Sequence, residues 1–318
     1  MVTVSKKLKG FIPYRIILWP DDATLKELAE HVPATQAVRV EGTNADLENG
    51  RYVVEHHLSL TLTIDLRRPL DELFKEMITN ARIRVRKAEK LGDRISVRRY
   101  SGGPDPEGIV DEFIELYNSF VDGKRGQAFA VSKELVDSFF PHADLILMCL
   151  DGKSIGGHFN LIDRDSGISR MILSGSRRFE DSATARLAGI LNVYLHWWEI
   201  SKYREEGMRT YDFGGIGGVG DNVGVNRFKL QFGRTIVREH NYLLAGMPGV
   251  WRTAFKAFTV LSPRGQRRRQ LERAGDRWKQ MPVERIREVI QTSVQDFEES
   301  HSTVPAEQKS SPAMSQVS

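Results

Sequence analysis

The sequence predicts a mixed α/β fold, in which one sheet carries helices on both faces. Three apolar segments separated by two tight turns are typical of antiparallel strands joined by hairpins; they span 144–150, 155–162 and 168–174. A long amphipathic helix ending at Gly207 and a strand–helix–strand series follow; that series spans 210–213, 225–232 and 234–244. This order favours a sheet with parallel and antiparallel neighbours.

The part of the chain before these strands predicts a small α+β unit and two helices. Alternating or apolar runs predict strands at 11–19, 36–41 and 58–66, with a helix over 23–31. Apolar residues at three- and four-residue spacing predict helices over 69–91 and 109–120. We therefore divide the chain into four parts: a partial N-terminal unit, a catalytic domain, a basic helical extension and a disordered tail. They span 1–66, 67–247, 248–297 and 298–318.

The composition indicates a globular protein and argues against a membrane-spanning or disulfide-rich one. The chain has 318 residues, of which 40% are hydrophobic and 28% charged, so it can bury a substantial core. Its longest apolar run, 145–150, is far shorter than the roughly 20 residues of a membrane-spanning helix. No apolar segment follows the N-terminal lysines, and the single Cys149 lies in a buried strand. We expect a cytoplasmic protein without disulfides.

Basic residues gather in two patches. Residues 82–99 hold eight basic and two acidic side chains, and residues 252–287 hold eleven and three. Such patches fit an anionic partner such as phosphate, nucleic acid or a membrane surface, although a solvated helix face explains either one equally well. The aromatic stripe within 250–287 adds the expectation of peripheral contact with an anionic membrane at the inner leaflet.

The glycine-rich loop over 214–224 follows a strand and contains G-x-G-x-x-G at 215–220. A dinucleotide fingerprint also needs a helix that opens at the loop within a βαβ unit. Only a helix of about two turns follows here, so we set the nucleotide-binding interpretation aside.

A longer pattern surrounds this loop. The chain reads YDFGGI at 211–216 and GVNRFKLQFG at 224–233, preceded by ARIRVRKAEKLG at 81–92 and LHWWEI at 195–200. Over roughly 58–245 the chain resembles the Fem-type aminoacyltransferases FemA, FemB and FemX, which form peptidoglycan bridges, and looser BioF2-like relatives. These belong to the GNAT acyltransferase superfamily. The resemblance implies a GNAT fold, with the N-terminal unit only partial.

The resemblance also implies the acyl donor and acceptor. Acetyl-CoA enzymes of the superfamily carry a glycine-containing loop before the long helix, whose amides bind pyrophosphate. This chain has RRFEDSATA at 177–185, without glycine. We therefore expect an aminoacyl-tRNA donor and no bound cofactor, with acyl-CoA as the alternative. The acceptor is expected to be an amine, or a diphosphate-linked amine, on a cell-envelope or polysaccharide precursor.

Acyl transfer needs a held carbonyl, a neutral amine and donors aimed at the oxyanion. A GNAT core implies that the carbonyl lies where the strands at 168–174 and 210–213 splay apart, near the amides of Leu173. Asp212 alternates to the face opposite Tyr211 and is expected to act as a base or to cap the glycine loop. Lys229 is the main catalytic candidate, because the family motif implies that Phe228 and Lys229 hold the donor.

The remaining predicted site residues bind substrate. They are Arg227, Tyr211, Gly214, Gly215, Arg84, Arg86, Lys87 and Arg177. The arginines and Lys87 are expected to receive phosphates of the acceptor or of tRNA. We assign His158 and His196 to packing, and His56-His57 has no third ligand nearby, so no metal site is predicted. A non-catalytic GNAT-fold module that binds RNA or anionic lipid is the competing hypothesis.

Overall fold

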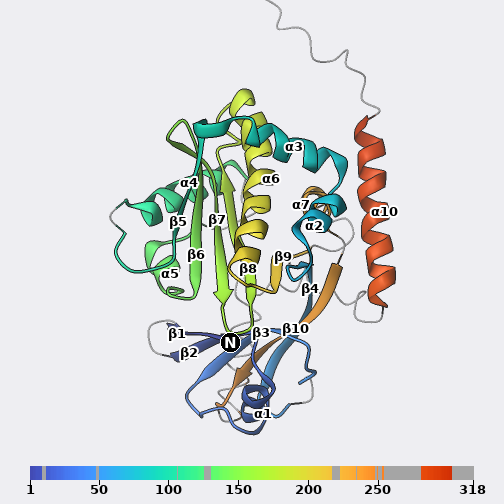
Figure 1. Ribbon diagram of the computed structural model, residues 1–318. Coiled ribbons are helices and arrows are strands. Elements are labelled where there is room, and N and C mark those ends of the chain that lie inside the picture. Colours follow the sequence, from blue (N-terminus) through green and yellow to red (C-terminus); the bar gives the residue numbers. More distant parts are fainter. Residues whose placement is uncertain are drawn as a thin grey trace, which may run out of the picture.

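In the computed structural model, the strands of the described residues form one ten-stranded sheet (Figure 1). The structure describes residues 1–8, 12–47, 50–105, 107–124, 130–216, 223–233, 235–247, 249, 253 and 281–302. The strand order is β1-β2-β3-β10-β4-β9-β8-β7-β6-β5. The strands are β1 (Val2–Leu8), β2 (Ile12–Leu18), β3 (Ala37–Thr43), β4 (Val53–Asp65), β5 (Ile95–Tyr100), β6 (Ala143–Leu150), β7 (Lys153–Asp163), β8 (Ile168–Ser176), β9 (Thr210–Gly215) and β10 (Thr235–Ala245).

The sheet is mixed, as the sequence predicts. The pairs β2–β3 and β8–β9 are parallel, and the other neighbours are antiparallel. The hairpins β6–β7 and β7–β8 confirm the three predicted antiparallel strands. The parallel β8–β9 connection passes through the long helix α6 (Ser182–Glu205), which is the crossover that a parallel pair requires.

Helices cover both faces of the sheet. The other helices are α1 (Asp22–Glu30), α2 (Leu70–Glu76), α3 (Thr79–Glu89), α4 (Ile109–Gly123), α5 (Lys133–Asp137), α7 (Val223–Lys229) and α10 (Val283–Ser302). The strand β6 shows the two faces: Ile146 packs in the core with α3 and α6, whereas Leu147 packs in the core with α4. In Figure 1, α6 crosses one face of the strands, and α10 stands at the side of α7.

The predicted helix over 69–91 is two helices, with a break at Met77 and Ile78. Both residues adopt extended backbone, with ψ of 142° and 152°. The Ile78 amide donates to the Gln231 carbonyl at 3.0 Å, outside any helix. The Arg82 guanidinium donates hydrogen bonds to the carbonyl oxygens of Lys75 and Met77, at 2.7 and 2.5 Å. These tertiary bonds replace the helical bonds that the periodicity predicts.

The N-terminal part does not form a sheet of its own. Strand β10, the last strand in the sequence, lies between β3 and β4, and β4 pairs with β9. The sheet therefore runs across the predicted boundary at residue 66. Of the predicted basic extension, residues 248, 250–252 and 254–280 lie outside the described residues. Helix α10 continues to Ser302, beyond the predicted start of the tail at 298.

Among the described helices, none is both long enough and apolar enough to cross a membrane.

Candidate active site

The candidate site begins where β8 and β9 stop pairing. Their parallel ladder ends at the pair Arg170–Asp212, although β8 continues to Ser176 and β9 to Gly215. Against β7, strand β8 has an extra residue at Ile172, between the pairs Phe159–Leu173 and Asn160–Met171. Such a bulge breaks the regular ladder and re-aims the backbone. The predicted splay near Leu173 is therefore present in the fold.

Gly214 allows β9 to turn at this point. Its φ of +70° lies in the left-handed region that glycine adopts without strain. A Cβ atom here would lie 2.7 Å from the Met171 carbonyl oxygen, which is closer than real contacts allow. Glycine is thus required both for the backbone conformation and for the close approach of β9 to β8.

Lys229, the last residue of α7, reaches this turn from the side. Its side chain is buried, with 6% exposed, and Nζ donates to the Gly215 carbonyl at 2.6 Å. Burial disfavours the charged ammonium and lowers the pKa of Lys229 from 10.5 to about 8, with Asp212 opposing and Arg170 reinforcing this shift. A lysine with a pKa near 8 can hold or transfer a proton close to neutral pH.

Asp212 is surrounded by donors. The Thr61 hydroxyl and the Gly214 amide donate to Oδ1, the latter at 2.7 Å. Arg170 Nε donates to Oδ2 at 2.7 Å. The carboxylate thus caps the glycine turn and pairs with a buried arginine, while its use as a base stays a prediction.

A cleft of about 270 Å³ opens on the same face of the sheet as Asp212. It is lined by Arg39, Glu41, His57, Ser59, Thr61, Arg170, Met171, Ile172, Gly214, Gly215, Glu239 and Asn241. Arg170 bridges Asp212 and Glu239 within its wall. Burial raises the pKa of Glu239, whose side chain comes from β10. Sequence reasoning missed Arg170 and Glu239; the available signal was Arg170 as the one charged residue of its predicted strand.

Other predicted residues lie on the opposite face. The Tyr211 hydroxyl is buried under α6, where it donates to Glu199 at 2.5 Å and lies 2.8 Å from His196 Nδ1. The Phe228 ring packs on His196 and Phe232, with centroid distances of 5.3 and 5.6 Å. Arg227 is exposed on α7. Of the predicted residues near the loop, Gly214 and Gly215 line the cleft.

The histidines form a buried network that the sequence did not predict. His158 Nδ1 lies 3.0 Å from Glu199, and His158 Nε2 lies 3.0 Å from Asn192 Oδ1. One ligand atom each of His158, His196 and Glu199 lies within 4.8 Å of the others, so the three side chains are close enough together to hold a metal ion. Burial lowers the pKa of His196 well below its usual value, so its ring is neutral. These contacts lock α6 onto the sheet.

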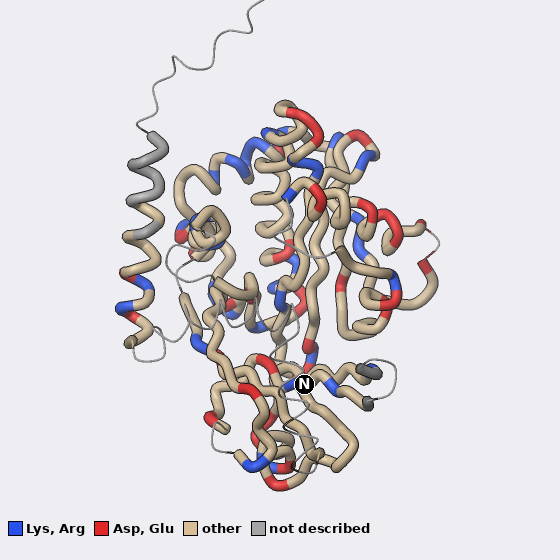
Figure 2. Tube along the Cα trace, turned by 180° about the vertical axis from the view of Figure 1, so that it is seen from behind, with Lys and Arg blue, Asp and Glu red and all other residues tan. Residues whose placement is uncertain are grey.

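The basic residues of α3 lie at the upper end of the sheet (Figure 2). Arg86 and Lys87 are exposed, Arg84 is half-buried, and the Arg86 guanidinium lies 5.7 Å from the centre of the Phe74 ring. The described lining of the 270 Å³ cleft includes none of the three. Arg177, before α6, donates to the Ser154 carbonyl at 2.6 Å and to Glu180 at 2.7 Å.

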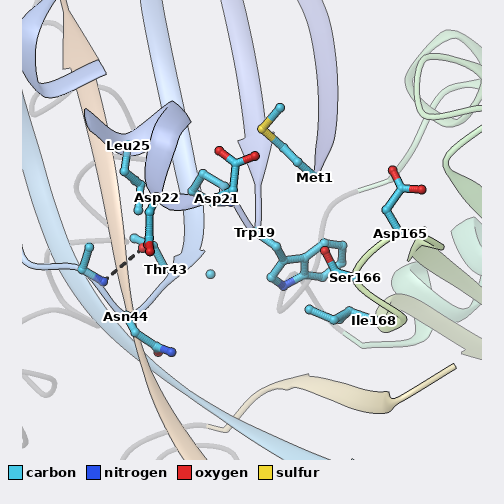
Figure 3. Close-up of a pocket in the computed structure, with 13 residues that line it drawn as sticks. Met1, Trp19, Asp21, Asp22, Leu25, Thr43, Asn44, Asp165, Ser166 and Ile168 are labelled. Carbon is cyan, nitrogen blue, oxygen red and sulfur yellow. Dashed lines mark hydrogen bonds between the residues drawn. The ribbon is translucent and has the colours of Figure 1, made fainter. Parts of the chain in front are cut away.

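A second, larger pocket of about 620 Å³ is drawn in Figure 3. Figure 3 shows Trp19 between the β7–β8 turn, which carries Asp165 and Ser166, and the end of β3. The Arg170 guanidinium lies 5.2 Å from the centre of the Trp19 ring. Trp19 and Arg170 therefore form the partition between the two hollows.

Comparisons with known proteins support the fold. Residues 75–230 match the acetyltransferase (GNAT) domain model. The solved structure of FemX is similar, with a TM-score of 0.53 and 17% identity over 76% of this chain and 83% of that one. The C-terminal domain of a putative lysylphosphatidylglycerol synthetase from Agrobacterium fabrum gives a TM-score of 0.50 and 12% identity over 79% and 84%. No curated protein matches the sequence.

Residues 75–230 therefore match a GNAT acyltransferase domain, and the protein is an acyltransferase. Its fold is Fem-like, as the sequence resemblance implies.

Proposed function

We propose that the protein is an N-acyltransferase that moves an aminoacyl or acyl group onto an amine of a cell-envelope or polysaccharide precursor. The observation that carries this proposal is the position of Lys229, a buried lysine at the point where β8 and β9 part, with Nζ on the Gly215 carbonyl. A fold does not need to bury an ammonium at such a point, and doing so costs free energy. The cost is explained if the ammonium acts on a substrate.

In this proposal Lys229 serves the donor side of the reaction. Its ammonium lies next to the end of the β8–β9 ladder, where a donor carbonyl fits between the strands. There it can donate a proton to the oxygen or sulfur that leaves the acyl carbon. Backbone amides of the irregular β8 segment around Ile172 would polarise the carbonyl.

The start of α6 supports an aminoacyl-tRNA donor over acyl-CoA. In CoA-dependent relatives the amides at this helix start bind pyrophosphate. Here the backbone amides of Ala183 and Thr184 donate hydrogen bonds to Asp181 Oδ1, each at 2.9 Å, and Glu180 directly precedes Asp181. A fixed carboxylate on these amides competes with pyrophosphate and repels it. Phosphates of tRNA or of a diphosphate-linked acceptor would instead meet Arg84, Arg86 and Lys87 on α3. We keep peripheral contact with an anionic membrane as part of this proposal.

The test compares donors directly. Purified protein is incubated with a pool of charged tRNAs or with acetyl-CoA, each with a panel of amines containing a lysyl peptide, an amino sugar and ethanolamine. We expect an amide product with charged tRNA, detected by mass spectrometry. A product with acetyl-CoA alone would overturn the donor assignment. Binding of RNA or lipid without any product would favour the non-catalytic module instead.

A further inference from the structure

We propose that the 270 Å³ cleft binds the ammonium group of the acceptor and that Glu239 takes its proton. This inference rests on the proposed function and extends it to the acceptor side. Glu239 lies on β10 and lines the cleft together with Gly214, Gly215 and Ile172. An amine held against Glu239 therefore shares one hollow with the end of the β8–β9 ladder, where the acyl carbonyl is expected.

Carboxylates outnumber guanidinium groups in the wall of the cleft. Arg39 pairs with Glu41, and Arg170 pairs with Asp212. Glu239 shares Arg170 with Asp212, so these three carboxylates face only two guanidinium groups. His57 also lines the cleft and adds no negative charge. With all of these groups ionised, they carry one surplus negative charge, and the nearby Lys229 ammonium cancels it when protonated. An acceptor ammonium is therefore held by the Glu239 carboxylate itself and not by a net charge of the cleft.

Glu239 is better placed than Asp212 to take the proton. Both oxygens of Asp212 accept bonds from Thr61, Gly214 and Arg170. Among the described residues, the only hydrogen bond to the Glu239 side chain comes from Arg170 and goes to Oε1. Oε2 is thus left for a ligand in the cleft. Burial raises the pKa of Glu239, and Asp212 and Glu41 raise it further against the opposing effect of Arg170. A raised pKa makes this carboxylate a stronger base.

The reaction balances with two groups of this chain. Glu239 accepts one proton from the ammonium, and the neutral amine then forms the new C–N bond with the acyl carbon. The bond from that carbon to the leaving oxygen or sulfur breaks as Lys229 donates a proton to the leaving atom. The nitrogen of the intermediate gives its second proton to the neutral Lys229. Glu239 releases its proton to water, so one proton is released for each amide formed.

The first experiment measures ammonium binding without any acyl donor. The protein is labelled with ¹³C at glutamate carboxyl groups and titrated with n-propylammonium chloride, with sodium chloride as the ionic-strength control. We expect a saturable shift of the Glu239 resonance, which is assigned by its absence in Glu239→Gln. The dissociation constant of n-propylammonium, measured from the shift of the Glu41 carboxyl resonance, should rise at least about tenfold in Glu239→Gln. It should stay unchanged in Glu115→Gln, which alters an exposed carboxylate on α4.

Each outcome decides the inference. No saturable shift in the wild-type protein, or equal affinity in Glu239→Gln, would overturn it. If Glu239→Gln unfolds, Glu239→Asp takes its place, because it keeps the charge but shortens the side chain. We expect Glu239→Asp to show a saturable shift on Glu41 with weaker affinity for n-propylammonium than the wild-type protein. Affinity equal to that of the wild type would overturn the inference.

The second experiment uses the donor that supports transfer by the wild-type protein. We expect Glu239→Gln to lower kcat at least about 100-fold and to remove the acidic limb of its pH profile, with Glu115→Gln unchanged. Full activity in Glu239→Gln would overturn the inference and leave the proposed function intact. A wild-type protein that transfers no acyl group would overturn the proposed function, while the ammonium titration still reports on the cleft.

Discussion

Lys229 is a cation that the fold buries without a direct ion pair in the described part of the chain; its ammonium has the Gly215 carbonyl as its hydrogen-bond acceptor. The pKa of Lys229 is lowered from 10.5 to about 8, mainly by burial. The folded state therefore holds the charged form at a cost. Residues that lower the stability of the fold in this way are typical of functional sites, where they are retained for their activity.

We expect Lys229→Met to stabilise the fold at pH 7. A pKa lowered to about 8 corresponds to at most about 3 kcal/mol of destabilisation by the charged lysine. Between pH 8 and 10.5 the unfolded chain binds more protons than the folded one, so wild-type stability rises with pH there. The gain from methionine should be largest below pH 8 and shrink toward pH 10.5. Urea unfolding at several pH values measures it.

The exposed Lys26 on α1 provides the control, because Lys26→Met should change stability little at any pH. A Lys229→Met protein that is less stable than wild type at pH 7 would contradict the account of Lys229 as a buried cation under strain.

At the scale of the element, the turn that ends β9 depends on glycine for two separate reasons. Gly214 and Gly152 both have positive φ, at +70° and +81°. A Cβ on Gly214 would meet the Met171 carbonyl oxygen at 2.7 Å, whereas one on Gly152 would meet nothing within 4 Å. The pair therefore separates backbone strain from steric contact.

We expect Gly152→Ala to cost about 1 kcal/mol of unfolding free energy, from backbone strain alone. Gly214→Ala should cost about 3 kcal/mol or more, because β9 must also move away from β8. Denaturant unfolding of the two variants gives both values. Equal costs would mean that β9 does not approach β8 as closely as the structure shows.

The elements that the sequence predicted are those with strong local patterns. Hairpins β6–β7 and β7–β8, helix α6 and the segment from β9 to β10 combine periodicity with turn residues. Strands β1 and β5 were not predicted, because both are edge strands in which a short apolar alternation gives way to basic residues such as Lys6 and Arg99.

The same limit applies to the site. Lys229 and Gly214 belong to one local motif and were predicted, and the structure brings them together. Arg170, Asp212 and Glu239 meet only through strand pairing across 42 and 69 residues of sequence. Register between strands so far apart depends on the whole sheet, so their contact could not be predicted from spacing.

At the scale of the whole molecule, one sheet joins the predicted N-terminal unit to the predicted catalytic domain. Strand β10 fills the place between β3 and β4, and β4 supplies Thr61 to the Asp212 carboxylate. The cleft takes residues from β3, β4, β8, β9 and β10. Both parts therefore contribute residues to the candidate site.

We expect a chain that lacks residues 1–66 to fail to fold. Removing β1 to β4 would leave β9 and β10 without the strand between them and would expose their backbone groups. A chain that ends at Ser302 keeps every described element and should unfold in one transition like the full chain. Circular dichroism melts compare them, and a cooperative melt of the 67–318 fragment would show that the catalytic part is independent.

The most direct measurement is the rate of acyl transfer from labelled donor to amine by wild type, Lys229→Met and Lys26→Met under identical conditions. The account predicts a loss of at least about 100-fold in Lys229→Met, in a protein at least as stable as wild type, with Lys26→Met unchanged. A Lys229→Met protein that transfers the acyl group at the wild-type rate would contradict it.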